Sequence, residues 1–175
     1  MELGLDTYLY AAEMACGLAI CHWRAKVDAN DVEFVLGSAP TTLNFGHITS
    51  RQLADMPKMT STYPDHLYNN FKKRTTHLWI LDFDKCHEMD VSDCGIEQAV
   101  KAAEDNDPYY PKPHKQLAED QQLWKHFKEA YLYSSSTIFL LDGIPEGMAK
   151  GPQKFIQGWE DYRKHKIDAG LVDDN

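Results

Sequence analysis

The sequence predicts an α+β domain that is mainly helical and carries a small two-stranded sheet. Segments with the apolar spacing of helices occur near both ends of the chain, and two short apolar runs of strand length lie between them. The 175 residues match the usual size of one domain, and a composition of 43% hydrophobic and 26% charged residues is typical of a folded protein. We therefore expect residues 1–175 to form a single domain.

Four segments have the periodicity of helices, and three of them have a local signal where they begin or end. Side chains that can cap a helix precede the first two, and a proline opens the last. The second helix should end before Asp107, because a residue that precedes proline avoids helical backbone angles. The expected bounds are Asp6 to Trp23, Ser92 or Asp93 to Asn106, Lys115 to Ser135, and Pro152 onward.

The two strands are expected at Val32–Leu36, closed by residues 37–40, and at Leu78–Phe83. The second run is apolar throughout, which predicts a strand that is covered on both faces. Residues 38–75 are rich in Gly, Pro, Ser, Thr and Asn and have no sustained period. We interpret them as a long loop or insertion, with one short helix near residues 50–56. Residues 171–175 are expected to form a frayed tail.

The net charge of −9 restricts the partners of the protein. Such a surface repels phosphate backbones and anionic lipids, so we expect neither nucleic acid nor membrane binding, but a protein or small-molecule partner. The basic run at residues 72–74 is interpreted as a solvated turn. Four scattered cysteines, no signal peptide and no apolar run of membrane length favour a cytoplasmic or nuclear protein that is not secreted.

Acidic residues stand where each predicted strand meets its loop. Asp28 and Asp31 precede the first strand, and Asp82 lies at the end of the second. Carboxylates brought together in this way can hold a magnesium ion, which prefers hard oxygen ligands. Asp82 shares a face with Ile80, so its charge is expected to need a cation or several hydrogen-bond donors. The alternative is that Asp82 and Asp84 only cap the turn after the strand.

Several stretches of the chain carry a family resemblance, and they span nearly its whole length. They are HWRAKVDANDVEFVLG, HLWILDFDKC, GIEQAVKAAEDNDPYYPKP and LWKHFKEAYLYSS. They resemble a fungal family of a domain of unknown function, whose members are commonly catalogued as zinc-finger proteins. The order of helix, acidic loop, strand and a second strand ending in LDFD is also similar to the C-terminal lobe of protein-kinase-like phosphotransferases.

The kinase resemblance implies a role for each acidic residue. Asp82 would match the magnesium-binding Asp of kinases, and Asp31 would match the catalytic-loop Asn. Asp28 would act as the catalytic base from a shifted backbone, because Lys26 occupies the usual spacing. Asp84 replaces the glycine of the Asp-Phe-Gly motif. No Gly-x-Gly-x-x-Gly loop precedes the first helix. Under the kinase resemblance we therefore expect the N-terminal lobe to be missing, and the chain to be a shortened gene product, a fragment or a single-lobe variant.

Zinc is not expected from the spacing of the cysteines and histidines. Residues 86–94 offer soft ligands but no paired Cys-x-x-Cys or His-x-x-x-His motif. Cys16 and Cys21 are interpreted as small core residues. Tyr109 and Tyr110 lie between prolines, in an extended segment that should expose their side chains to a partner.

Together these features predict a kinase-like remnant, similar to a pseudokinase, that serves as a non-catalytic binding or interaction module. An acidic pair cannot position a nucleotide without a lobe that holds the phosphates. Two alternatives stay open at this point. One is a magnesium-dependent phosphotransferase completed by a missing N-terminal segment or a partner, and the other is a zinc-dependent regulatory protein.

Overall fold

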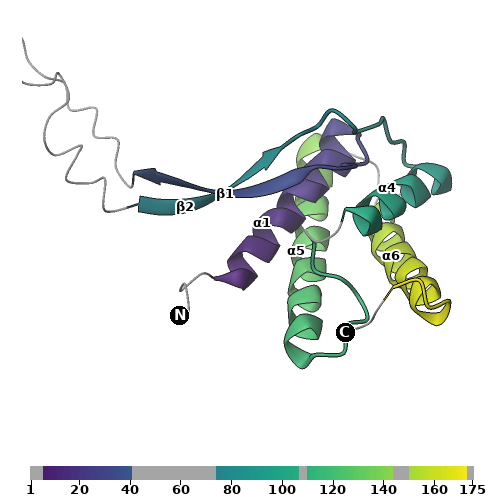
Figure 1. The fold of residues 1–175 in the computed structure, drawn as a ribbon. Coiled ribbons are helices and arrows are strands. Elements are labelled where there is room, and N and C mark those ends of the chain that lie inside the picture. The colour runs from purple at the N-terminus through teal and green to yellow at the C-terminus, as the bar shows by residue number, and fades with distance from the viewer. Residues whose placement is uncertain (1–5, 41–73, 107–109, 144–149, 173–175) are drawn as a thin grey trace, which may run out of the picture. The chain divides into compact units, whose positions relative to one another are not determined.

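The computed structural model describes residues 6–40, 74–106, 110–143 and 150–172. Within these ranges the chain forms four α-helices, one π-helix and an antiparallel sheet of two strands (Figure 1), so the predicted α+β class is confirmed. The chain divides into two compact units. The first comprises Met1–Val35 with Ile80–Asn175, and the second comprises Leu36–Trp79. The expectation of a single domain stays a prediction.

The first helical segment changes its winding part-way along. Helix α1 spans Thr7–Ala19 and continues as the π-helix η1 over Ile20–Ala25. The Asp6 side chain accepts a hydrogen bond from the Leu9 N–H at 3.0 Å, which confirms the predicted N-cap. Lys26 adopts the left-handed conformation and ends η1. The helical segment therefore ends two residues before the acidic segment 28–31.

The strands are longer toward the connecting segment than the sequence predicted. β1 spans Glu33–Pro40 and β2 spans Arg74–Leu81. Gly37 lies within β1 because the strand stays paired with β2 beyond it. The indole of Trp79 lies so close that a Cβ at Gly37 would come within 2.6 Å of the indole Nε1. The predicted helix near residues 50–56 lies outside the described residues, as do Lys72 and Lys73.

Three further helices complete the first unit. α4 spans Asp93–Asp105, α5 spans Ala118–Asp142, and α6 spans Gly151–Asp168 with Pro152 in its first turn. Ser92 caps α4 and Asn106 ends it, as predicted. α5 continues for seven residues beyond the expected end at Ser135, because Ile138 and Phe139 are buried in the core.

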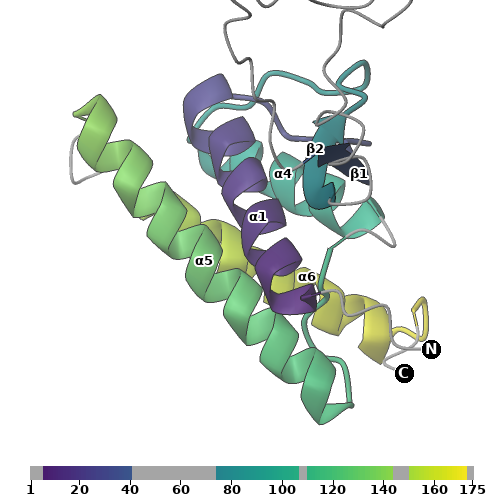
Figure 2. The same ribbon diagram turned by 90° about the vertical axis from the view of Figure 1, so that its left-hand side faces the viewer.

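The core of this unit is aromatic and is built mainly by α5 and α6 together with α1 and η1. α1 packs against α5, and α4 packs against α6, as Figure 2 shows. The largest fully buried apolar side chains are Leu18, Trp23, Phe127, Tyr131, Phe155 and Trp159. No helix in the described ranges has both the length and the apolar character that a membrane span requires.

Candidate acidic site

Asp28 is enclosed by hydrogen-bond donors and is only 3% exposed. Its Oδ1 accepts the backbone N–H groups of His87 at 2.9 Å and Asn30 at 3.1 Å, and its Oδ2 accepts from Gln98 Nε2 at 2.8 Å. Burial by itself raises the pKa of this carboxyl, but the donors outweigh burial and hold the pKa below its usual range. Asp28 is therefore a charged and fully engaged carboxylate at neutral pH.

A short antiparallel pairing brings those donors to Asp28. Val27 forms a β-bridge with Glu88, the Asp28 N–H donates to the His87 carbonyl at 3.0 Å, and the Met89 N–H donates to the Lys26 carbonyl at 2.8 Å. The segment from 26 to 31 also contains three non-glycine residues with positive φ, namely Lys26, Ala29 and Asp31. Such backbone conformations persist only where surrounding contacts hold them in place.

Asp31 lies outside this buried network and forms an ion pair with Lys85. The hydrogen bond from Lys85 to Asp31 and the charge of Asp31 raise the pKa of the Lys85 ammonium, and the nearby carboxylates Asp84 and Asp82 raise it further. Both members of the pair are largely solvent-exposed. Their attraction therefore contributes little to stability, but it partly neutralises the acidic group around Lys85.

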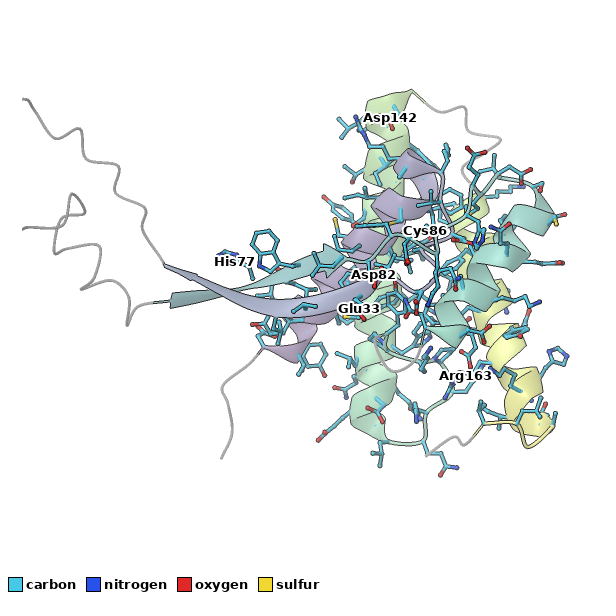
Figure 3. The ribbon with its side chains drawn as sticks, turned by 45° about the horizontal axis from the view of Figure 1, so that its top comes forward. Glu33, His77, Asp82, Cys86, Asp142 and Arg163 are labelled. Atoms are coloured by element: carbon cyan, nitrogen blue, oxygen red, sulfur yellow. The ribbon has the colours of Figure 1, made fainter. Side chains whose placement is uncertain are left out.

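Asp82 follows β2 directly and is exposed, with a positive φ of 59°. A hydrogen bond with Asp84 and the charge of Asp84 raise the pKa of the Asp82 carboxyl, and Glu33 and Asp31 add smaller contributions. Figure 3 shows Glu33 and Asp82 at the same end of the sheet. The expectation of a desolvated Asp82 was wrong, because β2 ends at Leu81 and Asp82 lies beyond the strand.

The apolar strand β2 is also less covered than the sequence predicted. Trp79 and Leu81 in the strand are exposed, and so is Phe83 just after it. Phe34 and Ile80 contact Gly17 of α1, so alternate residues face the helix. On the other face of the strand pair, Val35 and Leu81 are exposed to solvent.

Asp31 and Asp82 therefore belong to one acidic surface group with Glu33 and Asp84, in which Asp82 and Asp84 are exposed and Asp31 and Glu33 are half-buried. Asp28 occupies a separate buried position. Such a surface group attracts cations, because a bound cation offsets the repulsion between the four carboxylates. Within the described ranges, no set of three or more His, Cys, Asp or Glu side chains has a geometry suited to a metal ion. The metal-binding role of Asp31 and Asp82 and the catalytic role of Asp28 stay predictions.

The four cysteines are free and differ in their surroundings. Burial raises the pKa of the Cys21 thiol to about 11 and also raises the pKa of Cys86, to which the charge of Asp28 adds. Cys16 and Cys94 are exposed. Cys16 is thus not the core residue that the sequence predicted, because α1 buries the face that carries Ala11, Met14, Ala15 and Leu18.

Tyr110 is not exposed as expected from its place between prolines. It is 3% exposed, and its ring makes edge contacts with Phe34, Phe127 and Trp159. Aromatic packing of this kind stabilises the core. Tyr109 lies outside the described residues, so the partner-binding role of these two tyrosines stays a prediction.

Three residues that shape the site escaped the sequence analysis. His87 and Gln98 supply donors to Asp28, and Lys85 pairs with Asp31. Lys85 follows Asp82 and Asp84 closely in the sequence, and a basic residue so near two acidic ones could have been predicted to form an ion pair within the acidic group. Gln98 carried no such signal, because it reaches Asp28 from α4, 70 positions along the chain.

Comparison with known proteins gives a partial family match. Residues 78–142 match a family described as zinc finger protein, which is a domain of unknown function. The match covers β2 from Leu78, the segment after it, α4 and α5. No curated protein and no solved structure matches the chain.

Proposed function

We propose that the chain is a kinase-like remnant of the fungal family that its sequence resembles, and that it acts as a non-catalytic binding or interaction module. The pairing of β1 with β2 supports the kinase-like part of the proposal. It brings together Asp31, two residues before β1 begins, and Asp82, the residue after β2 ends, which are the two positions that the kinase resemblance assigns to metal binding. The net charge of −9 favours a protein or small-molecule partner over nucleic acid or membrane. The free thiols suit a cytoplasmic or nuclear setting.

The observation that carries the non-catalytic part is the environment of Asp28. A general base works best when its pKa lies near the working pH and when it can reach the proton that it removes. The Asp28 carboxylate has a lowered pKa, is almost fully buried, and accepts hydrogen bonds on both oxygens from the His87 N–H and the Gln98 amide. These properties suit a structural carboxylate that joins segments of the fold.

The exposed acidic group favours one alternative, a magnesium-dependent phosphotransferase completed by an N-terminal segment or a partner. Asp31 and Asp82 influence each other electrostatically and remain open to solvent, as ligands for a magnesium-nucleotide complex would need to be. In that case Asp28 would have to exchange its present hydrogen bonds for a substrate hydroxyl.

Thermal unfolding with ATP separates these two functions. A nucleotide present at about 100 times its dissociation constant adds about 2.7 kcal/mol, which raises the melting temperature by roughly 5–10 °C. We expect no such rise with ATP, whether or not magnesium is added. A magnesium-dependent rise that Asp82→Asn removes and Asp168→Asn retains would replace the proposal with the phosphotransferase.

The family description favours a second alternative, a zinc-dependent regulatory protein. Exposed Cys94 and half-buried Cys86 lie inside the matched segment and are the thiols there that could contribute ligands. Metal analysis of protein purified without chelators tests this function. We expect no stoichiometric zinc, and one zinc per chain that is lost in Cys86→Ser but retained in Cys16→Ser would support the alternative.

A further inference from the structure

His22 lies wholly inside the core of the first unit. It belongs to the π-helix η1, its side chain is 0% exposed, and its ring makes edge contacts with Tyr131 and Phe155, at 5.9 Å and 4.7 Å between ring centroids. Its Nδ1 lies 2.9 Å from the Tyr131 hydroxyl, whereas its Nε2 makes no hydrogen bond of good geometry within the described ranges. One hydrogen bond and the surrounding aromatic rings therefore hold this imidazole in place.

Burial determines the charge of the His22 imidazole. A protonated ring would place a positive charge among aromatic side chains, where water cannot solvate it. Asp28 from the segment after η1 and Tyr131 from α5 are titratable groups that face the ring, whereas Phe155 from α6 carries no charge. Burial raises the pKa of Tyr131 well above its ordinary value, so its hydroxyl stays neutral. Burial lowers the pKa of His22 to about 3 and outweighs the backbone and the charge of Asp28, which favour protonation of the ring.

The position of His22 links its charge to the segment that carries Asp28. The Val27 N–H donates to the Cys21 carbonyl at 2.9 Å, so the start of this segment is bonded to the π-helix. Residues 26–31 include three non-glycine residues with positive φ, a conformation that persists only where surrounding contacts support it. Turns of π-helix are rare and often occur at functional sites. Removal of His22 from the core would therefore also release the residues that follow η1.

We propose that His22 is the sensor of an acid-sensitive lock, in which the neutral imidazole keeps η1 and residues 26–31 closed and its protonation opens them. We call this arrangement the His22 lock. In the open form the ring is in water and takes up a proton at its ordinary pKa of 6.5. Opening also separates Asp28 from the donors on His87 and Gln98 that stabilise its charge. The lock requires neither a partner nor a nucleotide, so it is independent of the proposed function.

The pH range of the His22 lock follows from the difference between the closed and the open form. The pKa of His22 in the closed form, about 3, lies below the 6.5 of the open form. The stabilisation of the closed form is therefore complete above pH 6.5 and is lost progressively as the pH falls toward 3. Between about pH 7 and about pH 5 the ratio of open to closed molecules should rise roughly 25-fold. A segment that is open in about 1% of molecules at the higher pH would then be open in about 20% at the lower.

Amide hydrogen exchange of the full chain tests the His22 lock. The Val27 N–H bonds to the Cys21 carbonyl and the Met89 N–H bonds to the Lys26 carbonyl, so exchange at these two amides reports the opening of the segment. After correction for the intrinsic exchange rate at each pH, the opening constant of both amides should rise roughly 25-fold between about pH 7 and about pH 5. An opening constant that stays the same over this range would overturn the proposal.

Two variants at position 22 remove the group that titrates. Neither His22→Gln nor His22→Phe can take up a proton there, so in each the opening constant should change by less than about threefold over the same pH range. Each variant is compared with itself at the two pH values, so a general loss of stability does not affect the result. His165→Gln is the matched control and should keep the full rise, because His165 is an exposed histidine on α6. A full rise in both variants at position 22, or its loss in His165→Gln, would contradict the role of His22.

NMR spectroscopy of the wild type tests the His22 lock without any substitution. The ring resonances of His22 in the closed form should keep the positions of a neutral imidazole down to about pH 5, because the closed core excludes the charged ring. Titration of these resonances with a midpoint near the ordinary value of 6.5, without loss of amide protection at Val27 and Met89, would show that the core accepts the charged ring. That result would exclude the lock.

Discussion

At the scale of single residues, Asp28 and Asp82 show how differently two carboxylates behave, one before β1 and one directly after β2. Asp28 is buried and stays charged, because the His87 N–H and the Gln98 amide stabilise its ionised form. Asp82 is exposed and retains its proton to a higher pH, because Asp84 lies beside it. Contacts with neighbouring groups, and not the residue type, decide the charge state of each.

Replacing Asp28 by Asn should destabilise the protein in a pH-dependent way. The amide cannot accept from the Gln98 donor as the carboxylate does, so we expect a loss of about 2 kcal/mol at neutral pH. Because the folded pKa lies below the ordinary value of 3.8, the stabilisation is present above that pH and is lost as the pH falls through the folded pKa. Urea unfolding of the wild type and of Asp28→Asn, measured at several values between about pH 3 and pH 7, gives both the loss at neutral pH and its dependence on pH.

Asp168→Asn is the matched control for this variant, because Asp168 is an exposed carboxylate in an ion pair with Lys164. Its free energy of unfolding should change by less than about 1 kcal/mol. Equal losses in Asp28→Asn and Asp168→Asn at neutral pH would show that the hydrogen bonds around Asp28 contribute little.

At the scale of elements, local signals located the helices better than the strands. The caps at Asp6 and Ser92 and the proline at the start of α6 mark helix ends through contacts within a few residues. The ends of β1 and β2 depend instead on pairing between segments far apart in the chain. Turn-forming residues 37–40 therefore predicted an end to β1 where the strand in fact continues.

The first turn of α4 offers a test in which helix propensity and tertiary contact predict opposite results. In an open helix, Gly→Ala stabilises by up to about 1 kcal/mol. At Gly95 a Cβ would overlap the backbone carbonyl of Asp90, so Gly95→Ala should lower the free energy of unfolding by about 1–3 kcal/mol. Glu97→Ala, at an exposed position of the same helix, should change it by less than about 0.5 kcal/mol in urea unfolding. A stabilised Gly95→Ala variant would contradict the close approach of Asp90.

At the scale of the whole molecule, a buried ion pair joins α4 to α6. Glu104 is almost fully buried, and it accepts from Trp159 Nε1 at 2.9 Å and from Arg163 at 2.8 Å, while Lys166 lies 3.6 Å away. Such a pair links the two helices, because removing either partner would leave an uncompensated charge buried in the core. It fixes α6 relative to α4 and thereby the aromatic core that α6 shares with α5.

Glu104→Gln should therefore lower the free energy of unfolding by about 3 kcal/mol, because Arg163 would lose the charge that offsets its burial. Chemical denaturation monitored by tryptophan fluorescence measures the loss, since Trp159 binds the same carboxylate. Asp105→Asn, at a neighbouring exposed position, should cost less than about 1 kcal/mol. Similar values for the two variants would argue against the buried pair as a connection between the helices.

The sequence by itself determined the α+β class, the helices and their caps, because these follow from apolar periodicity and contacts within one or two turns. Only the tertiary structure decided the burial of Tyr110 and the exposure of Asp82. It also brought His87 and Gln98 to Asp28 from 59 and 70 positions along the chain. Which side chain ends beside which is set by packing between distant segments, and a single sequence read locally does not contain that information.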